Sequence, residues 1–295
     1  MSAKLIVTHI SPDLDAVASV WLLRRFDKQH FENAGLAFVA AGEKIADSQI
    51  YDLGIKSEDV EHVDTGQGRF DHHMEDLALE KVCAASLVFD YLVEKYPSLG
   101  KDEALKRLVD HVVEVDHFGE FFWPEPNSDR YVFQLEEILG FIKSAAGTDD
   151  EVVEFGMRAL DAVHAALIAK VSAEGDLDKG QKFMTVWGEG FAVETVNDSV
   201  INLAQKSGYK VVVRKDPEYK NIRIKAVPGA GVDLTPIYEK IIGLEKRATW
   251  YLHPSKTMLL NGSDKRRKQV ASGLRLDEII NIIKEVKLDE SQLGL

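Results

Sequence analysis

Apolar residues follow two different periods along the first half of the chain. Short apolar runs of strand length alternate with longer segments in which apolar positions recur every three to four residues, the spacing of an amphipathic helix. The expected strands lie at 4–10, 36–42 and 60–66, and the expected helices at 15–31, 84–96, 102–119, 131–145 and 150–173. Strands that alternate with helices form βαβ units, so this half predicts an α/β fold whose mainly parallel sheet is flanked by helices.

A polar stretch with two glycines at 172–182 interrupts this pattern and is the expected linker between two domains. Beyond it, strand character returns at 183–196, 209–216 and 221–229, and helix character at 198–208 and 276–287. We therefore expect a first domain at 1–175 and a second, smaller α/β domain at 183–295. A chain of 295 residues is long enough to bury two such cores.

The composition is that of a soluble globular protein, with 45% hydrophobic and 29% charged residues. No apolar run approaches the roughly 18 residues of a membrane span, and the N-terminus lacks the basic and apolar regions of a secretory signal. Cys83 is the only cysteine and lies in an apolar stretch, which excludes disulfides and cysteine-ligated zinc. We expect a cytoplasmic protein that does not bind membranes.

The net charge of −13 opposes binding to long duplex nucleic acid. The distribution of charge along the chain is more informative about the site. Residues 1–130 hold 25 Asp and Glu against 13 Lys and Arg. Residues 246–268 hold seven Lys and Arg and only one acidic residue. An acidic region and a small basic cluster in one chain suit a metal site and an anionic substrate, respectively.

Histidines and aspartates gather where the predicted strands end, beginning with the stretch THISPDLDAV at 8–17. They are His9, Asp13, Asp15, Asp64, Asp71, His72 and His73, with Asp110 and Asp116 near the end of a predicted helix. Because the carboxyl ends of parallel strands share one edge of a sheet, different strands would deliver these side chains to one site. Helix capping is the alternative for Asp13 and Asp15, but it explains one carboxylate and leaves His9 without a role.

The residue types favour a divalent-metal site. Aspartate oxygens and neutral imidazoles suit Mn²⁺, Mg²⁺, Fe²⁺ or Zn²⁺. Four aspartates carry roughly the charge that two such cations cancel, and without cations buried carboxylates would repel one another and protonate. Two cations about 3.5–4 Å apart are the arrangement that catalyses in-line displacement at phosphorus.

Three ordered motifs carry a family resemblance over roughly residues 4–120. His-x-x-x-Asp-x-Asp at 9–15, Val-Asp-Thr-Gly at 63–66 and Asp-His-His at 71–73 resemble the motifs of the DHH phosphoesterase superfamily. This superfamily includes single-strand exonucleases, nanoRNases, cyclic-dinucleotide phosphodiesterases and family II inorganic pyrophosphatases. The chain is most similar to the nanoRNase and exonuclease-like branch.

The resemblance implies that domain 1–175 is a metal-binding catalytic domain of the DHH type. Its implied ligands are His9 and Asp13 for one cation, Asp15, His72 and Asp116 for the other, and Asp64 between the two. Asp110 remains the alternative to Asp116. The implied catalytic residues are His73, which faces the substrate phosphate, and Asp71, which orients a neighbouring side chain. The resemblance also implies two divalent cations, Mn²⁺ by preference, with Mg²⁺ or Co²⁺ as alternatives.

The resemblance makes residues 183–295 a C-terminal substrate-binding domain. Its candidate substrate-binding residues are His253, Lys256, Asn261, Gly262, Ser263 and Arg266. The Gly-Gly-Gly-His run of nuclease-type relatives is absent, so the substrate class stays open. The Asn-Gly-Ser turn at 261–263 is equally compatible with a phosphate-binding turn and with a plain hairpin turn.

The sequence therefore predicts a metal-dependent phosphoesterase that hydrolyses phosphodiester bonds of short oligonucleotides or small nucleotides, with water as the nucleophile. One alternative is a small-anion phosphatase of the pyrophosphatase type. Another is a non-catalytic module that binds a metal or a nucleotide. A homodimer is an open possibility for the assembly.

Overall fold

The chain divides into two compact units at a point inside one long helix. The computed structural model describes residues 4–74, 80–145, 147–262 and 269–287, and its units are Met1–Ile168 and Ala169–Leu295. Helix α7 (Asp149–Lys179) continues through most of the segment 172–182 expected to link two domains, so that segment is helical over most of its length. Gly180 follows this helix. A Cβ at this position would lie 2.0 Å from Cζ of Phe191, so a larger residue would clash with that ring.

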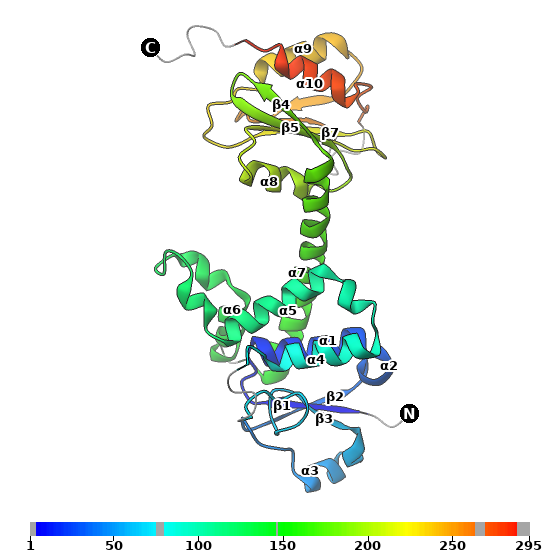
Figure 1. Cartoon of the computed structure of the whole chain (residues 1–295), viewed down its shortest axis with the longest axis vertical. Coiled ribbons are helices and arrows are strands. Elements are labelled where there is room, and N and C mark those ends of the chain that lie inside the picture. The colour runs from blue at the N-terminus through cyan, green and yellow to red at the C-terminus, as the bar shows by residue number, and fades with distance from the viewer. Residues whose placement is uncertain (1–3, 75–79, 146, 263–268, 288–295) are drawn as a thin grey trace. The chain divides into compact units, whose positions relative to one another are not determined.

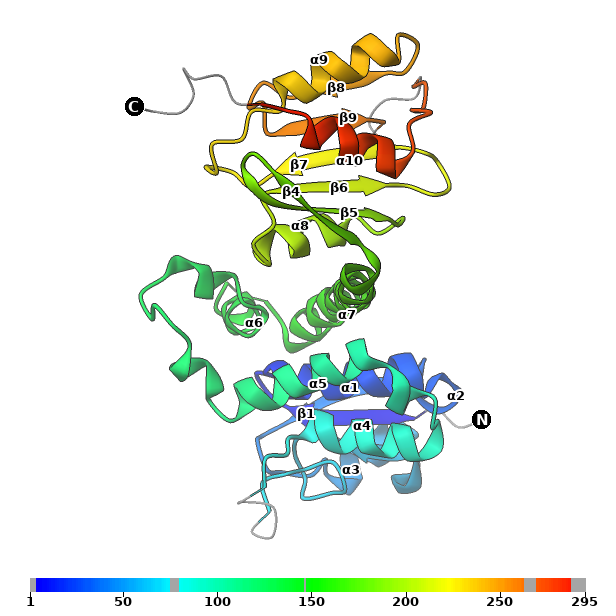
Figure 2. The same ribbon diagram turned by 45° about the horizontal axis from the view of Figure 1, so that its top comes forward.

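Unit 1 is built on a three-stranded parallel sheet of order β2-β1-β3. Its strands are β1 (Leu5–His9), β2 (Gly35–Val39) and β3 (Val60–His62), and its helices are α1 (Leu14–Phe26), α2 (Lys28–Phe31), α3 (Asp47–Asp52), α4 (Ala84–Lys95), α5 (Glu103–Asp116), α6 (Leu135–Ser144) and the first part of α7. Helices α1, α4 and α5 lie on one side of the sheet and α3 lies on the other (Figure 1). The same two layers are visible in the turned view of Figure 2.

Strand β1 is buried on both faces, as expected for the central strand of a parallel sheet. Ile6 joins the large core formed with the helices, whereas Leu5 and Val7 join a smaller core on the opposite face with Val39 and Ile50. The alternation follows from the two-residue period of a strand. Burial on both faces explains why this strand is a continuous apolar run in the sequence.

Unit 2 contains a six-stranded mixed sheet of order β4-β5-β6-β7-β9-β8. Its elements are β4 (Gln181–Thr185), β5 (Gly188–Glu194), α8 (Ser199–Lys206), β6 (Val211–Lys215), β7 (Ile222–Ala226), α9 (Thr235–Leu244), β8 (Trp250–Leu252), β9 (Met258–Asn261) and α10 (Leu276–Lys284). Only β5 and β6 pair in parallel among these described strands, and the other neighbours are antiparallel. One core packs α9 and α10 against this sheet, and a second contains residues of α8 and the end of α7.

The predicted fold class is confirmed at the level of two α/β units, one with a parallel sheet and one with a mixed sheet. The third strand is shorter than expected, because the backbone of Asp64 adopts a left-handed conformation with φ 54° and ends the extended segment. No helix in the described part of the chain combines the length and apolarity needed to cross a membrane.

The carboxylate of Asp27 anchors a buried polar network in unit 1. It accepts hydrogen bonds from Lys95 Nζ at 2.7 Å, from Tyr91 Oη at 2.8 Å and from Tyr96 Oη at 2.9 Å, and lies 2.8 Å from His30 Nδ1. Burial would raise the pKa of Asp27, but these partners outweigh it and hold the pKa at about 2. Because of this lowered pKa, we expect Asp27 to contribute to stability in a pH-dependent way.

We expect Asp27→Asn to lower the free energy of unfolding at pH 7 by about 3 kcal/mol, because it leaves a buried network without its charge. In the wild type, the folded pKa lies below the unfolded value. Asp27 therefore stabilises the fold above about pH 4 and loses about 2 kcal/mol as the pH falls toward 2. Urea titrations at both pH values measure these effects. Asp161→Asn, which removes a half-exposed partner of Arg25, is the matched control and should cost about 1 kcal/mol or less. Equal pH dependence in the wild type and Asp27→Asn would contradict this prediction.

Candidate metal centre

The carboxyl ends of β1 and β3 bring the first predicted ligands together. His9 is the last residue of β1, and the parallel register pairs Val7 with His62, so continuation of that register brings His9 level with Asp64. After β1 the chain turns at Ser11, whose φ is 59°, and reaches Asp13. Asp13 caps α1, because its Oδ1 accepts a hydrogen bond from the backbone N–H of Ala16 at 3.0 Å. Its second oxygen, Oδ2, lies 3.8 Å from His9 Nε2, so capping leaves this oxygen facing the histidine.

His9, Asp13 and Asp64 form the first potential ligand set. The Nε2 atom of His9 lies 3.2 Å from Asp64 Oδ2, and one ligand atom from each residue lies within 4.8 Å of the others. The His9 and Asp64 side chains are nearly buried, whereas that of Asp13 is 60% exposed. This set therefore opens toward solvent on the side of Asp13.

Asp15, His72 and Asp116 form the second potential ligand set. His72 is at its centre: Nε2 lies 3.7 Å from Asp15 Oδ2, and Nδ1 lies 3.8 Å from Asp116 Oδ2. The structure brings Asp116, at the end of α5, to this group, whereas Asp110 on the same helix is exposed and lies outside the groups found among the described residues. The geometry thus favours Asp116 over Asp110.

Asp15 also anchors the N-terminus of a helix, although the helix is α4 and not its own. Its two carboxylate oxygens each accept a backbone N–H bond at 2.7 Å, one from Ala84 and one from Ala85. Each carboxylate oxygen has a second lone pair, so these bonds orient Asp15 without exhausting its capacity as a ligand.

Asp64 lies between the two sets. Its Oδ1 is 3.4 Å from His72 Nε2, and its Oδ2 faces His9. Its left-handed backbone is held by a bond of 2.9 Å from its own N–H to the carbonyl of Phe70, which closes the loop that leads to the histidine pair. A non-glycine residue held in this region stores strain, and such strain clusters at functional sites.

Two buried polar atoms at the centre of the group lack a hydrogen-bond partner in the described part of the chain. They are Asp64 Oδ1 and His72 Nε2, which lie 3.4 Å apart as an ion pair without the geometry of a hydrogen bond. An acceptor and an imidazole nitrogen buried without partners are costly, and a cation placed between them would satisfy both. The donor set of carboxylates and imidazoles without thiolate fits a hard or borderline divalent cation.

The electrostatics of the group indicate an excess of negative charge. Burial, assisted by the charge of Asp64, raises the pKa of Asp15. Partial desolvation by the neighbouring groups, together with the charge of Asp64, raises the pKa of Asp13. Burial raises the pKa of Asp116 as well. These carboxyls therefore ionise less readily than isolated ones, and bound positive charge would reverse the effect.

The two histidines of the group hold protons more strongly than usual. Burial opposes protonation of His9, but its bond to Asp64 and the charge of Asp13 outweigh burial and raise its pKa to about 9. The contact with the Asp64 carboxylate raises the pKa of His72 to about 9 despite burial. Burial would raise the pKa of Asp64, yet the ion pair with His72 and the bond with His9 lower it. Without a metal, protons on these histidines offset the carboxylates, and a metal would replace those protons.

Asp71 orients His73. The buried carboxylate accepts the His73 backbone N–H at 3.1 Å and lies 3.0 Å from His73 Nδ1, while its other oxygen accepts the Gln67 N–H at 2.7 Å. The His73 side chain is 64% exposed and its Nδ1 lies 3.8 Å from Asp64 Oδ1. Asp71 thus holds the Nδ1 edge of the ring and leaves Nε2 for a ligand.

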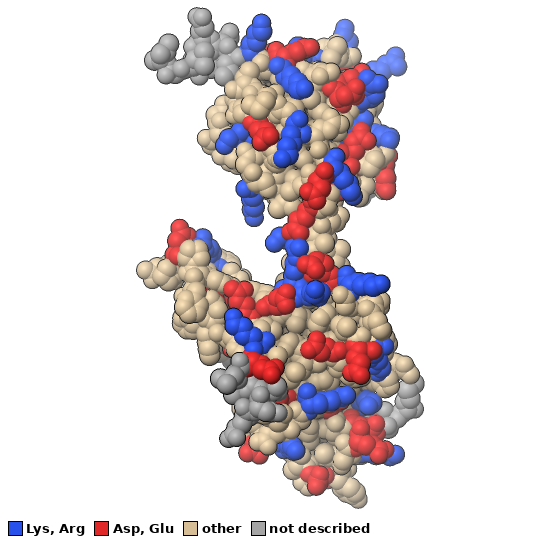
Figure 3. Space-filling model, in the orientation of Figure 1, with Lys and Arg blue, Asp and Glu red and all other residues tan. Residues whose placement is uncertain are grey.

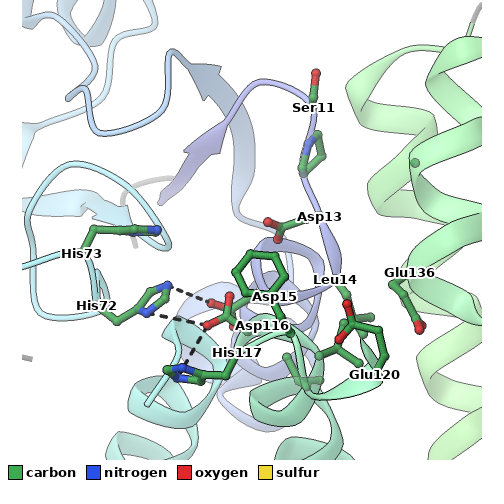
Figure 4. A pocket seen from close by; sticks show the side chains of 15 residues that line it. Ser11, Asp13, Leu14, Asp15, His72, His73, Asp116, His117, Glu120 and Glu136 are labelled. Carbon is green, nitrogen blue, oxygen red and sulfur yellow. Dashed lines mark ion pairs between the residues drawn. The ribbon is translucent and has the colours of Figure 1, made fainter. Parts of the chain in front are cut away.

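A pocket of about 530 Å³ adjoins the group and falls in the size range of small-molecule sites. Its walls include Asp13, Asp15, His72, His73 and Asp116, together with residues that the sequence reasoning missed: Ser11, His117, Phe118, Glu120 and Glu136. Figure 4 shows His72 with ion pairs to Asp15 and Asp116, and Asp116 beside His117. Of these residues, His117 was the one that the sequence marked, because it directly follows the candidate ligand Asp116.

Four of the candidate substrate-binding residues of unit 2 are described by the structure: His253, Lys256, Asn261 and Gly262. The buried side chain of Asn261 donates to the carbonyls of Thr249 and Val270 and accepts the Ser272 N–H, so its amide has no donor to spare for a phosphate. Gly262 has φ 92° and a Cβ there would lie 2.8 Å from Asn221, so glycine is required by the turn.

The two remaining described candidates are engaged with neighbours in unit 2. His253 Nδ1 lies 2.8 Å from Ser255 Oγ, and Lys256 Nζ pairs with Asp233 Oδ2 at 3.0 Å. Ser263 and Arg266 lie outside the described residues. Lys and Arg side chains are interspersed with Asp and Glu on the face shown in Figure 3.

The fold and the site define an α/β protein with a candidate dinuclear metal centre at the carboxyl edge of a parallel sheet. The family model described as ChrB, C-terminal domain, matches residues 6–167, and the chain belongs to this family. The match coincides with unit 1 and includes all six candidate ligands.

The other comparisons add little. No curated protein matches the sequence. One solved structure, titled as a DHH domain of a member of the s1p family of ribosomal proteins, is similar with 10% sequence identity and a TM-score of 0.32, over 95% of this chain and 85% of that chain.

Proposed function

We propose that this protein is a phosphoesterase that uses two divalent cations, Mn²⁺ by preference, to hydrolyse phosphodiester bonds of short oligonucleotides or small nucleotides. One observation carries the proposal: Asp64 belongs to the set of His9 and Asp13 and also groups with His72, the centre of the second set, and among the described residues the facing atoms Asp64 Oδ1 and His72 Nε2 are buried without a hydrogen bond. The motif resemblance to DHH phosphoesterases supports the same activity.

The residues of the site have different roles in the proposed reaction. His9, Asp13 and Asp64 would hold one cation, and Asp15, His72 and Asp116 would hold the other. When bound, such a pair supplies Lewis-acid charge that activates water and neutralises the phosphoryl group. Asp71 holds His73 so that its free ring nitrogen points to the substrate phosphate, where a donated hydrogen bond would stabilise charge as it develops.

The direct test measures hydrolysis of bis(p-nitrophenyl) phosphate and of 2–10-mer RNA and DNA, cyclic dinucleotides and pyrophosphate, with Mn²⁺ and with EDTA. We expect Mn²⁺-dependent turnover of the generic diester and of short oligonucleotides or dinucleotides. Turnover of pyrophosphate alone would favour the small-anion phosphatase. Metal binding without turnover of any phosphoester would contradict the enzyme proposal and favour a metal-binding module.

The contact between Asp71 and His73 predicts a non-additive pair of variants. His73→Gln is expected to lower kcat by about 100-fold, as loss of one charge-stabilising donor does. Asp71→Asn is expected to lower kcat by about 10-fold or more, because it disturbs an orienting partner. Since Asp71 acts through His73, the double variant should be no slower than His73→Gln alone. If the two losses multiply in the double variant, Asp71 does not act through His73.

A further inference from the structure

The pocket extends beyond the candidate metal ligands to residues that the proposed reaction does not use. Phe118 follows α5, Glu120 lies in the 3₁₀ turn Gly119–Phe122, and Glu136 lies in the first turn of α6. Figure 4 shows Glu120 and Glu136 on the side of the pocket opposite His72 and His73. This second wall is the place where the rest of a substrate would lie once its phosphate faces His73.

Phe118 offers an aromatic surface at this wall. The residue is 66% exposed, which is unusual for phenylalanine, and its backbone is held in a left-handed conformation with φ 56°. The ring centroid lies 5.9 Å from that of Phe121, which is also exposed. A strained backbone that keeps a phenylalanine at the pocket wall indicates a binding role, and planar ligands stack on such rings.

The carboxylates of Glu120 and Glu136 each have an oxygen with unused hydrogen-bonding capacity. The Oε2 atom of each is buried without a partner in the part of the chain that the structure describes. Burial, together with the charge of Glu120, raises the pKa of Glu136. Carboxylates accept N–H donors and repel anions, so a second phosphoryl group is disfavoured at this wall. A planar group with N–H donors at its edge could stack on the ring of Phe118 and donate hydrogen bonds to the carboxylates.

Building on the proposed function, we infer that this wall is a nucleobase subsite that selects bases with exocyclic amino groups. Phe118 stacks on the face of the base, and Glu120 and Glu136 accept hydrogen bonds from its edge. Guanine, with parallel N1–H and amino donors, fits a carboxylate best, and adenine and cytosine each present one amino group. Uracil and thymine present carbonyl oxygens at these positions, which the carboxylates repel.

Two measurements test the subsite. One is equilibrium binding of GMP, AMP and UMP to the full-length protein in the presence of Mn²⁺, by isothermal titration calorimetry. The other is kcat/KM for pGpG, pApA and pUpU. We expect the wild type to bind GMP and AMP at least about five-fold more tightly than UMP and to show the same order in kcat/KM.

The variants separate the two contacts. Phe118→Ala is expected to weaken binding of all three nucleotides by about five-fold or more, in line with the effect of removing a stacking partner. Glu120→Gln and Glu136→Gln are expected to reduce the ratio of GMP to UMP affinity toward one. Phe133→Ala and Glu137→Gln are matched controls, because both residues are exposed and neither lines the pocket; they should retain the wild-type ratio.

Failure of the subsite and failure of the proposed function give different results. If the wild type hydrolyses bis(p-nitrophenyl) phosphate with Mn²⁺ but binds GMP, AMP and UMP equally, the subsite is wrong and the phosphoesterase proposal stands. A base preference unchanged in both glutamine variants would likewise overturn the subsite. Absence of Mn²⁺-dependent turnover on every phosphodiester overturns the proposed function, and with it the subsite inference that depends on it.

Discussion

Asp64→Asn is expected to reduce Mn²⁺-dependent phosphodiester hydrolysis by about 10³-fold or more, because metal-based charge stabilisation contributes several kcal/mol and each 1.4 kcal/mol is tenfold in rate. Asp64 is the one carboxylate that faces both candidate sets, through Oδ2 toward His9 and Oδ1 toward His72. Asparagine keeps the shape of the side chain and removes the charge. The measurement is kcat/KM for bis(p-nitrophenyl) phosphate at saturating Mn²⁺.

Asp110→Asn is the matched control for this variant. Asp110 is an exposed aspartate of the same unit, and it lies outside the candidate ligand groups found among the described residues. Its substitution should leave activity within about two-fold of the wild type, whereas Asp116→Asn should impair it. Wild-type rates in Asp64→Asn, with circular dichroism unchanged, would contradict the assignment of Asp64.

The second large effect concerns stability. Mn²⁺ at about 100 times its Kd is expected to stabilise the folded protein by about 2.7 kcal/mol, because a ligand that binds only the folded state shifts the unfolding equilibrium. For a protein of this size that corresponds to a rise in Tm of about 5–10 °C. A thermal scan with Mn²⁺ and with EDTA measures the shift directly.

Replacing a candidate ligand should remove most of this shift. His9→Ala and His72→Ala each remove the histidine of one set, so each should lower the Mn²⁺-dependent rise in Tm by more than half. His111→Ala is the matched control, since His111 lies on α5, stacks on Trp123 and is outside the ligand groups of the described chain. Equal Mn²⁺-dependent shifts in all three variants and the wild type would mean that the metal binds elsewhere.

Much of unit 1 and its site was accessible from sequence because local pattern and chemistry agree there. The run at Leu5–His9 is apolar throughout because β1 is buried on both faces. The parallel register then carries His9 and Asp64 to the same edge, as the strand-end rule predicts. The assignment of Asp13 both as a helix cap and as a potential ligand is compatible with the two different environments of its oxygens.

Other features depend on tertiary contacts that no local pattern contains. Asp15 caps α4, which is 69 residues away in the sequence. Gly175 and Gly180 resemble linker residues, but α7 continues to Lys179 because its final turns pack into unit 2 through Ala173. In the sequence, Asn261 resembles a turn residue that could bind phosphate. Only the folded unit shows that its side-chain amide is hydrogen-bonded to three backbone groups.

The second wall of the pocket was also beyond local reasoning. Phe118 and Glu120 lie in and just before a 3₁₀ turn and Glu136 in the first turn of α6, and only the fold brings them beside Asp116. Their side chains are common surface types, so nothing in their spacing marks them. Exposure of the phenylalanine and burial of the carboxylate oxygens are properties of the structure alone.

The central claim is that two divalent cations bind around Asp64, and the most direct measurement is the metal content of the purified protein. After dialysis against Mn²⁺ and removal of free metal, inductively coupled plasma mass spectrometry should find two manganese ions per chain in the wild type and at most one in Asp64→Asn. No bound manganese in the wild type, or an equal content in Asp64→Asn, would contradict the account.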